Sequence, residues 1–398
     1  MKYTFKLVNR IKYNKRLYSI YFIIGNWCIS ILRLFVKPQR NLIVFSSFGG
    51  RKFDDSPKVI YDAMLRDKRF ENFELIWAFA QPEMFVLEKG RKIRIDTFTY
   101  FKILLKARVW ITNSSMLRGL NFTGINTFQL NTWHGSAIKK MGDDINLGNT
   151  AFKIKEKKTV PYIMLAQGNY DVKIFHQAFH HPIKDFRIVG LPRNDELATP
   201  SQERQKTLKK KLGIPIQKKV ILYAPTYREY DKDKSGNCIY APSIHLKKWA
   251  QKLSDNYVLL FRAHYEIVNA LNIVDDDFVK NVSAYPNLNE LILASDILIS
   301  DYSSIFFFFF FTGKPMLCFT YDFDKYQSLR GMYFDIREEL DMKDCSANED
   351  DIISSLLNMD TEMRCTVTKR FRDKYVEKYG NATLEVLDII YQEAICTK

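Results

Sequence analysis

The sequence predicts an α/β protein with two doubly wound domains that face one another across a cleft. The chain has 398 residues, which is long enough for two or three domains that each bury a core. Short apolar runs alternate with helical stretches in two successive series, which is the pattern of parallel sheets covered by helices. Ligands of such sheets bind beyond the carboxyl ends of the strands, where this chain carries its unusual polar residues.

The pattern divides the chain into four parts. We expect an N-terminal helical segment at residues 1–40 and a first domain at 41–182. A second domain follows at 183–370, and a C-terminal helix at 371–398 packs back on the body.

The composition excludes several classes of protein. Apolar residues make up 46% and charged residues 26%, which are globular values. The net charge of +15 favours an anionic partner. No zinc-finger spacing or RNA-binding aromatic motif occurs, so we expect no nucleic-acid partner. The six cysteines are scattered without a CxxC pair, so we expect no metal and no cofactor, and a reducing compartment rather than a disulfide framework.

The N-terminal segment contains an uncharged run at residues 17–32, with basic residues on both sides. These sixteen residues fall short of the roughly 20 that a helix needs to cross a bilayer. The run predicts a monotopic helix in the membrane interface, with Trp27, Arg33 and Lys37 as contacts to an anionic lipid surface. The alternative is a helix that packs on the protein's own core.

The first series predicts buried parallel strands at residues 41–47, 73–79, 108–113, 125–133 and 162–168. A helix is expected to begin at Ser56–Pro57, because serine is a good N-cap and proline suits the first turn. Residues 97–107 are a second helix candidate.

The second series predicts strands at residues 186–190, 219–226, 257–264, 296–301 and 315–321. Helices are expected at residues 199–214, 244–253, 288–295 and 381–395. The unbroken phenylalanine run at 306–311 predicts a core helix, because a helix that is apolar on all sides is a buried one.

The strand that ends near Trp133 runs into the motif TWHGSAIKKMG. His134 is a candidate general base, because histidine exchanges protons near neutral pH. Gly135 allows the backbone to approach a ligand closely. The alternative is a histidine that only caps the turn.

Other strand ends carry candidate anion contacts. Arginine suits bidentate phosphate binding, and arginine with histidine on one face of an extended segment forms an anion site. The candidates are Arg193, Pro225, Thr226, Arg228, Arg262 and His264. Each of them could instead be structural.

The segment SDYSS follows the strand at 296–301. Ser303 and Ser304 are natural helix N-caps, and Asp301 stands at the strand end. A helix N-terminus offers free amides and a positive dipole to phosphate. Together, the clusters suit transfer chemistry on a nucleotide-diphosphate donor.

In this order, TWHGSAIKKMG, GLPRND, ILYAPTYRE, FRAHY and SDYSSIFF resemble the CDP-glycerol glycerophosphotransferase family of teichoic acid synthesis. The resemblance covers roughly residues 41–340. It implies a GT-B-like fold of two Rossmann-like domains, the first on the acceptor side and the second binding the donor. It also implies a peripheral protein on the cytoplasmic face of the membrane.

The activity implied by the resemblance is transfer of a polyol phosphate from a CDP-polyol donor to a hydroxyl of an undecaprenyl-linked acceptor, with release of CMP. His134 would be the general base, and His264 a second catalytic residue. The implied donor-binding residues are Trp133, Gly135, Ser136, Arg193, Pro225, Thr226, Arg228, Arg262, Asp301, Ser303 and Ser304.

Two positions depart from the family pattern. Ala137 stands where the family's HGTP motif has proline, and Phe308 stands where the family has an aspartate. The missing aspartate leaves a catalytically impaired scaffold at the membrane as one alternative. The other is a nucleotide-sugar glycosyltransferase of capsule synthesis, which the same architecture and basic cleft would also serve. The sequence leaves open glycerol or ribitol, primase or polymerase, the polymer made and the oligomeric state.

Overall fold

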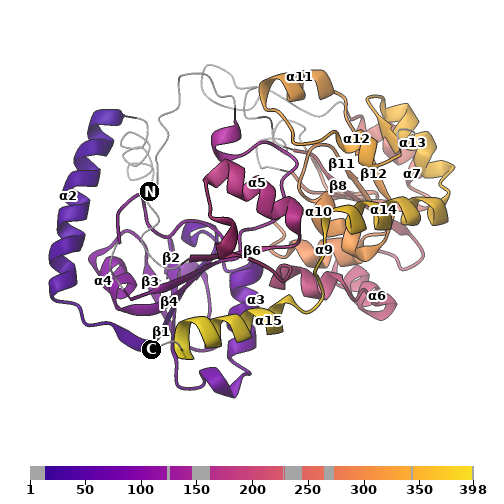
Figure 1. The fold of residues 1–398 in the computed structure, drawn as a ribbon. Coiled ribbons are helices and arrows are strands. Elements are labelled where there is room, and N and C mark those ends of the chain that lie inside the picture. The colour runs from indigo at the N-terminus through magenta and orange to yellow at the C-terminus, as the bar shows by residue number, and fades with distance from the viewer. Residues whose placement is uncertain are drawn as a thin grey trace.

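The structure is a computed structural model that describes residues 14–122, 126–145, 162–226, 228, 244–263, 273–341 and 344–396. The described chain forms two lobes, each built around one parallel sheet with helices on its faces (Figure 1). This is the α/β, GT-B-like fold class that the sequence predicts.

The sheet of the first domain has seven strands among the described residues, in the order β3-β2-β1-β4-β5-β6-β7. Its strands are β1 (Gln39–Ser46), β2 (Glu74–Phe79), β3 (Arg91–Arg94), β4 (Ala107–Thr112), β5 (Phe128–Asn131), β6 (Tyr162–Ala166) and β7 (Phe186–Ile188). Neighbouring strands pair in parallel, so the carboxyl ends of β1, β4 and β5 lie side by side.

The sheet of the second domain has six strands in the described part of the chain, in the order β10-β9-β8-β11-β12-β13. They are β8 (Lys219–Ala224), β9 (Tyr257–Phe261), β10 (Val279–Asn281), β11 (Ile297–Ser300), β12 (Met316–Phe319) and β13 (Cys345–Ser346). The central strands β8 and β11 are adjacent, which places the residues that follow them next to each other.

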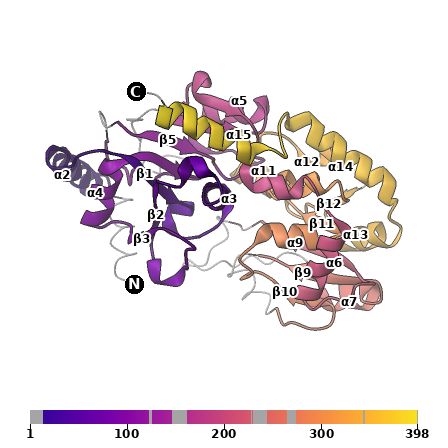
Figure 2. The same ribbon diagram turned by 90° about the horizontal axis from the view of Figure 1, so that it is seen from below.

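The helices cover both sheets (Figures 1 and 2). In the first domain they are α2 (Lys15–Leu34), α3 (Asp55–Met64), α4 (Phe98–Lys106) and α5 (Asn169–Phe179). Those after β7 are α6 (Gln202–Lys211), α7 (Leu246–Leu253), α9 (Leu288–Ala294), α10 (Phe306–Phe309), α11 (Phe323–Leu329), α12 (Ile336–Glu339), α13 (Glu349–Leu357), α14 (Thr361–Tyr375) and α15 (Ala382–Ile389).

The ten strands expected from the apolar runs all form, but one belongs to the other sheet. We expected the strand near residues 186–190 to open the second series, and this was wrong. It is β7, which pairs with β6 at the edge of the first sheet. Strands β3, β10 and β13 were not predicted, because they are short edge strands without a continuous apolar run.

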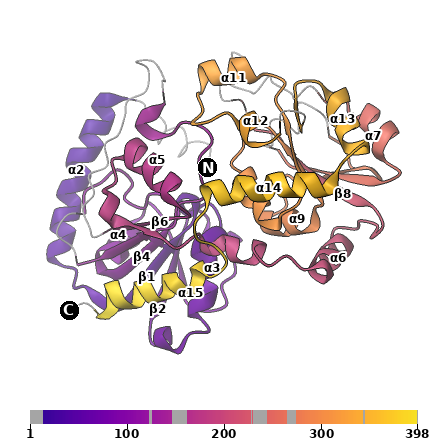
Figure 3. The same ribbon diagram turned by 45° about the vertical axis from the view of Figure 1, so that its right-hand side comes forward.

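The chain passes between the domains at two places. The first crossing follows β7, through the short helix η6 (Pro192–Leu197). The second joins α14, whose Phe371 lies in the core of the second domain, to α15, whose Val386 lies in the core of the first. Figure 3 shows α14 and α15 as consecutive helices that run from one lobe to the other. The C-terminal helix therefore packs back on the body as expected.

Helix α2 is longer than the uncharged run, because Lys15, Arg16 and Arg33 continue it to 20 residues. The expectation that it is too short to cross a bilayer was therefore wrong, since Arg16–Leu34 suffices by length and composition. In the structure, however, α2 lies along the outer side of the first domain beside α4 (Figures 1 and 2).

One side of α2 contacts the domain and the other side is exposed. The Tyr21 hydroxyl donates to the carbonyl of Arg118 at 2.9 Å, and Asn26 Oδ1 accepts from the amide of Asn121 at 2.7 Å. Trp27 is 66% exposed, on a stripe of exposed apolar side chains formed by Ile20, Ile23, Ile24, Trp27, Ile31 and Leu34. The spacing of this stripe is that of one helix face.

The phenylalanine run is buried throughout, as predicted, and forms α10 and one further turn of 3₁₀ helix. Two of its rings face the first domain. The ring of Phe307 stacks with Tyr170 of α5, with the centroids 6.0 Å apart, and Phe308 lies against Gly135. The run is thus the centre of the domain interface as well as part of the core of the second domain.

Candidate active site

His134 lies three residues beyond the end of β5, which is Asn131. The Asn131 side chain accepts from the amide of Trp133 at 2.8 Å and turns the chain. Trp133 has a φ of 49°, a conformation that non-glycine residues adopt at a cost of about 1–3 kcal/mol. Its ring stacks on the His134 ring with centroids 4.2 Å apart. The turn is strained and holds the imidazole in one orientation.

The tautomer of His134 follows from a single contact. Its Nδ1 lies 2.8 Å from the carbonyl oxygen of Asn113, which follows β4. Since a carbonyl can only accept, Nδ1 carries the proton and Nε2 keeps a free lone pair. Burial lowers the pKa of His134, so the ring is neutral at neutral pH. A neutral histidine with Nε2 unprotonated is the form that a general base requires.

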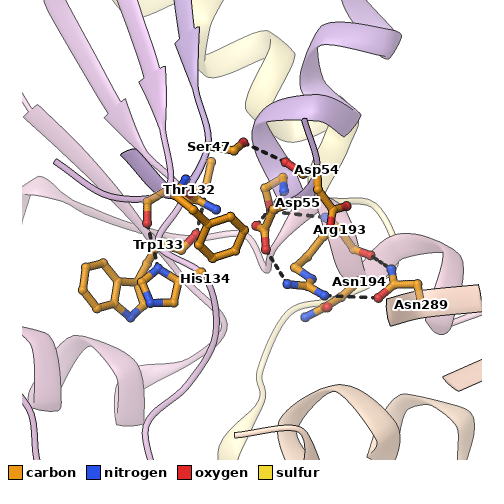
Figure 4. A network of polar contacts seen from close by, with 12 residues as sticks. Ser47, Asp54, Asp55, Thr132, Trp133, His134, Arg193, Asn194 and Asn289 are labelled. Atoms are coloured by element: carbon orange, nitrogen blue, oxygen red, sulfur yellow. Dashed lines mark hydrogen bonds and ion pairs between the residues drawn. The ribbon is translucent and has the colours of Figure 1, made fainter. Parts of the chain in front are cut away.

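Arg193 bridges the two domains beside His134 (Figure 4). Its guanidinium forms an ion pair with the buried carboxylate of Asp55 at the start of α3. Its other terminal nitrogen donates to Asn289 Oδ1 at 3.3 Å, and its centre lies 4.3 Å from the centroid of the Phe308 ring. Arg193 is therefore fixed in place by residues of both domains.

Two more cations lie near this pair. Partial burial lowers the pKa of Lys52; Asp54 opposes that shift, and Arg262 adds to it. Arg262 follows β9 and donates to the carbonyls of Val282 and Tyr285 at 3.1 and 2.8 Å. Cations that lower one another's pKa values attract an anion to the same region.

The turn after β11 is held by Asp301. Its two carboxylate oxygens accept from the amide of Thr226 at 2.9 and 3.0 Å, and one also accepts from the amide of Tyr302 at 2.6 Å. Asp301 therefore ties the ends of β8 and β11 together. The hydroxyl of Thr226 is buried without a hydrogen-bond partner among the described residues, so it is available to a ligand group.

A cavity of about 370 Å³ is lined by Asp55 and Arg193 but not by His134. Its lining includes five carboxylates but only two cations, Lys58 and Arg193. An acidic lining repels a pyrophosphate. This cavity therefore does not suit a pyrophosphate, in contrast to the region where Arg193, Lys52 and Arg262 gather.

Comparison with known proteins decides the family. The model of the family described as CDP-Glycerol:Poly(glycerophosphate) glycerophosphotransferase matches residues 29–392. The chain belongs to this glycerophosphotransferase family.

Its relatives include a teichoic acid poly(glycerol phosphate) polymerase of Staphylococcus epidermidis, 36% identical over 77% of this chain and 43% of the polymerase. A teichoic acid glycerol-phosphate transferase of Staphylococcus aureus is 34% identical over 76% of this chain and 80% of that protein. The chain thus spans less than half of the first relative and most of the second.

Solved structures of the wall teichoic acid polymerase TagF have the same fold. A histidine-to-asparagine variant of TagF is 30% identical, with a TM-score of 0.80, over 96% of this chain and 97% of that chain. The same variant after a soak with CDPG matches with a TM-score of 0.79 at 29% identity, over 96% of this chain and 97% of that chain.

The structure gathers most of the residues that the family resemblance assigns to the site into two groups. His134, Trp133 and Gly135 share one turn, and Arg193 lies across from them (Figure 4). Pro225 and Thr226 follow β8 and are buried next to Asp301. Ser303 and Ser304 are half-buried in the turn that follows. His264 lies outside the described residues.

Two of the residues assigned to donor binding, Arg228 and Ser136, have buried side chains. The Arg228 side chain has no exposed surface and pairs with Asp301 and Asp322, at 3.0 and 2.8 Å. Ser136 is 2% exposed, and its hydroxyl accepts from Gln167 Nε2 at 2.9 Å. Both side chains are buried in contacts with other parts of the chain, and their assignment to donor binding stays a prediction.

The helix after the serines also differs from expectation. Its N-cap is Ile305, without a side-chain cap, whereas Ser303 Oγ accepts from the amide of Ile305 at 3.3 Å. The helix has four residues, so its dipole is small. The groups that this turn can present to a ligand are therefore the serine hydroxyls and the backbone amides.

Sequence reasoning missed Lys52, Asp55 and Asn113. All three follow the carboxyl ends of β1 or β4, the positions where parallel sheets bind ligands. Applying that rule to every strand of the first sheet would have found them.

Proposed function

We propose that the protein transfers glycerol phosphate from a CDP-glycerol donor to a hydroxyl of a lipid-linked acceptor and releases CMP. The membership of the family supports this reaction, and so do the glycerol-phosphate names of both relatives. The CDPG soak of TagF supports the class of donor.

The observation that carries the proposal is the state of His134. It is neutral, its Nε2 has no hydrogen-bond partner among the described residues, and it lies beside Arg193, which has Lys52 and Arg262 as neighbours. Transfer of a phosphoryl group to an alcohol needs a base and cations close together. The base accepts the proton of the alcohol, and the cations stabilise the negative charge that accumulates on the phosphates.

In the proposed reaction, His134 Nε2 takes the proton of the acceptor hydroxyl as its oxygen attacks the glycerol-bearing phosphorus. A new phosphorus–oxygen bond forms, and the bond from this phosphorus to the CMP oxygen breaks. Lys52, Arg193 and Arg262 stabilise the charge on the phosphates. The hydroxyls of Thr226, Ser303 and Ser304 bind the leaving CMP side.

We place the protein at the cytoplasmic face of the membrane as a peripheral protein. The exposed stripe of α2, with Trp27 at its centre, would lie in the interface, and Arg33 and Lys37 are exposed toward anionic headgroups. This position brings the first domain to a lipid-linked acceptor, which the family resemblance implies to be undecaprenyl-linked.

The test is release of CMP from CDP-glycerol and from CDP-ribitol with a lipid-linked acceptor. We expect turnover with CDP-glycerol, and a loss of about 100-fold or more in His134→Asn, because a positioned base contributes 10²–10⁴-fold. His245→Ala is the matched control, since His245 is 76% exposed in a surface ion pair on the second domain.

Two outcomes would contradict the proposal. If turnover is unchanged in His134→Asn, then His134 is not the general base. A wild-type protein that is stabilised by CDP-glycerol in thermal unfolding but releases no CMP would favour the scaffold instead.

A further inference from the structure

Phe308 makes two contacts outside its own helix that no other residue of the phenylalanine run makes among the described contacts. Its ring is 4% exposed and lies on the guanidinium of Arg193, 4.3 Å from centroid to Cζ. The tip of the same ring lies against Gly135, in the turn that carries His134. One side chain of the second domain thus contacts both the turn that carries His134 and the arginine beside it.

The contact with Gly135 leaves no room for another atom. Gly135 has a φ of 136°, and a Cβ at this position would be 2.5 Å from the Phe308 ring tip. Real Cβ atoms do not approach that closely, so backbone and ring are already in van der Waals contact. The His134 turn therefore rests on the ring.

The contact with Arg193 covers the face of an otherwise fixed guanidinium. Asp55 and Asn289 hold its terminal nitrogens, while its buried Nε has no hydrogen-bond partner among the described residues. A cation over a desolvated ring face is attracted by the ring's quadrupole. Without the ring, the guanidinium would lose the partner that keeps it flat against the interface.

We propose that Phe308 is a positioning residue for the transfer reaction: its ring sets the place of the His134 turn and of the Asp55–Arg193 pair together. This inference rests on the proposed role of His134. Phe308 touches neither the base ring nor a donor group, so it acts through Gly135 and Arg193. The base and the cation are then aligned by one rigid group at the domain interface.

Two substitutions separate the two contacts. Phe308→Tyr keeps the aromatic face for Arg193 but adds an oxygen at the ring tip, which forces the Gly135 turn to move. Phe308→Met keeps similar apolar volume but removes the aromatic face. Phe309→Met is the matched control, because Phe309 is also fully buried in α10 and has no described contact with Gly135 or Arg193.

We expect kcat for CMP release to fall about 10- to 100-fold in both Phe308 variants, because a misplacement of about 1 Å can cost that much. The KM for CDP-glycerol should change less than kcat, since the ring reaches the donor only through Arg193. Phe309→Met should keep kcat close to the wild-type value. Phe308 variants with the kcat of Phe309→Met would overturn the inference.

A thermal cycle tests the inference independently of activity. Arg193→Lys should lower Tm less in the Phe308→Met background than in the wild type, because the ring contact is already lost. Additive losses of Tm would overturn the inference. If the wild type releases no CMP but the losses are not additive, the proposed function fails and the contact between ring and guanidinium stands.

Discussion

Asp171 is a carboxylic acid without an ion-pair partner among the described residues, directly behind the turn that carries His134. It is 2% exposed, and burial raises its pKa to about 6, while Ser136 and the amide of Gln167 oppose the shift. An acid whose folded pKa is raised stabilises the protein below its unfolded pKa of 3.8, and this contribution is lost as pH rises through about 6.

Asp171→Asn is therefore expected to raise the free energy of unfolding at pH 8 by about 1–3 kcal/mol, with little change at pH 4. Urea unfolding at both pH values measures the difference. Asp255→Asn, at an exposed position, is the control and should stay within about 0.5 kcal/mol. An equal effect at pH 4 and pH 8 would show that Asp171 does not titrate in this range.

At the residue scale, the sequence predicted which positions are polar at strand ends but not which way their side chains face. His134 was singled out by the family resemblance, since a histidine at such a turn could also be structural. Arg228 and Ser136 also follow strand ends, but their side chains face inward. Arg228 pairs with Asp322 and Ser136 with Gln167, and both partners come from other parts of the chain. A contact over 94 residues in sequence cannot be read from local pattern.

Helix α2 contacts the first domain on one side and has an exposed apolar stripe on the other. Tyr18 and Tyr21 donate to backbone carbonyls of residues 118–119, while the stripe around Trp27 has no cover among the described residues. An exposed apolar face flanked by basic residues favours an anionic lipid surface.

The paired substitution Ile23→Glu and Trp27→Glu is expected to reduce binding to vesicles with anionic lipid at least about 10-fold, because both side chains would leave the apolar layer. Co-sedimentation measures the bound fraction. Leu357→Glu, at a 51% exposed apolar position of the second domain, is the control. Equal binding of all three proteins would exclude α2 as the contact.

At the element scale, long central strands were predictable because burial on both faces makes a continuous apolar run. The edge strands were not, since β3 reads RKIR and has one buried residue in four. The sheet to which β7 belongs could not be predicted either, because the sequence of a strand does not determine which neighbour it pairs with.

The two domains share an aromatic interface. Tyr170 of α5 stacks on Phe307 and packs edge-on against Tyr375 of α14, with centroids 4.8 Å apart. Its hydroxyl also donates to the carbonyl of Ala137 at 2.6 Å, close to the His134 turn. We therefore expect this interface to couple the folding of the domains.

Tyr170→Ala is expected to lower stability by about 3–5 kcal/mol, as other large-to-small aromatic changes do, and to separate one calorimetric transition into two. Tyr170→Phe is the control, because it keeps the rings and loses only one hydrogen bond. A single transition at an unchanged Tm in Tyr170→Ala would show that the domains are held by other contacts.

For the whole molecule, the two-sheet fold and the burial of the phenylalanine run could be predicted from apolar patterning. The role of that run at the domain interface could not, because patterning shows that a side chain is buried but not against what. Phe308 is an example: its neighbours Gly135 and Arg193 are far from it in sequence and come from two different loops.

The two crossings of the chain between the domains have a mechanical consequence. Two points of attachment define a line, and two rigid bodies joined along a line keep one easy degree of freedom, rotation about it. Sliding and twisting of one domain past the other would stretch one of the connections. If the domains open, we therefore expect a rotation about this line, which would carry the His134 turn and the turn after β11 apart along a single arc.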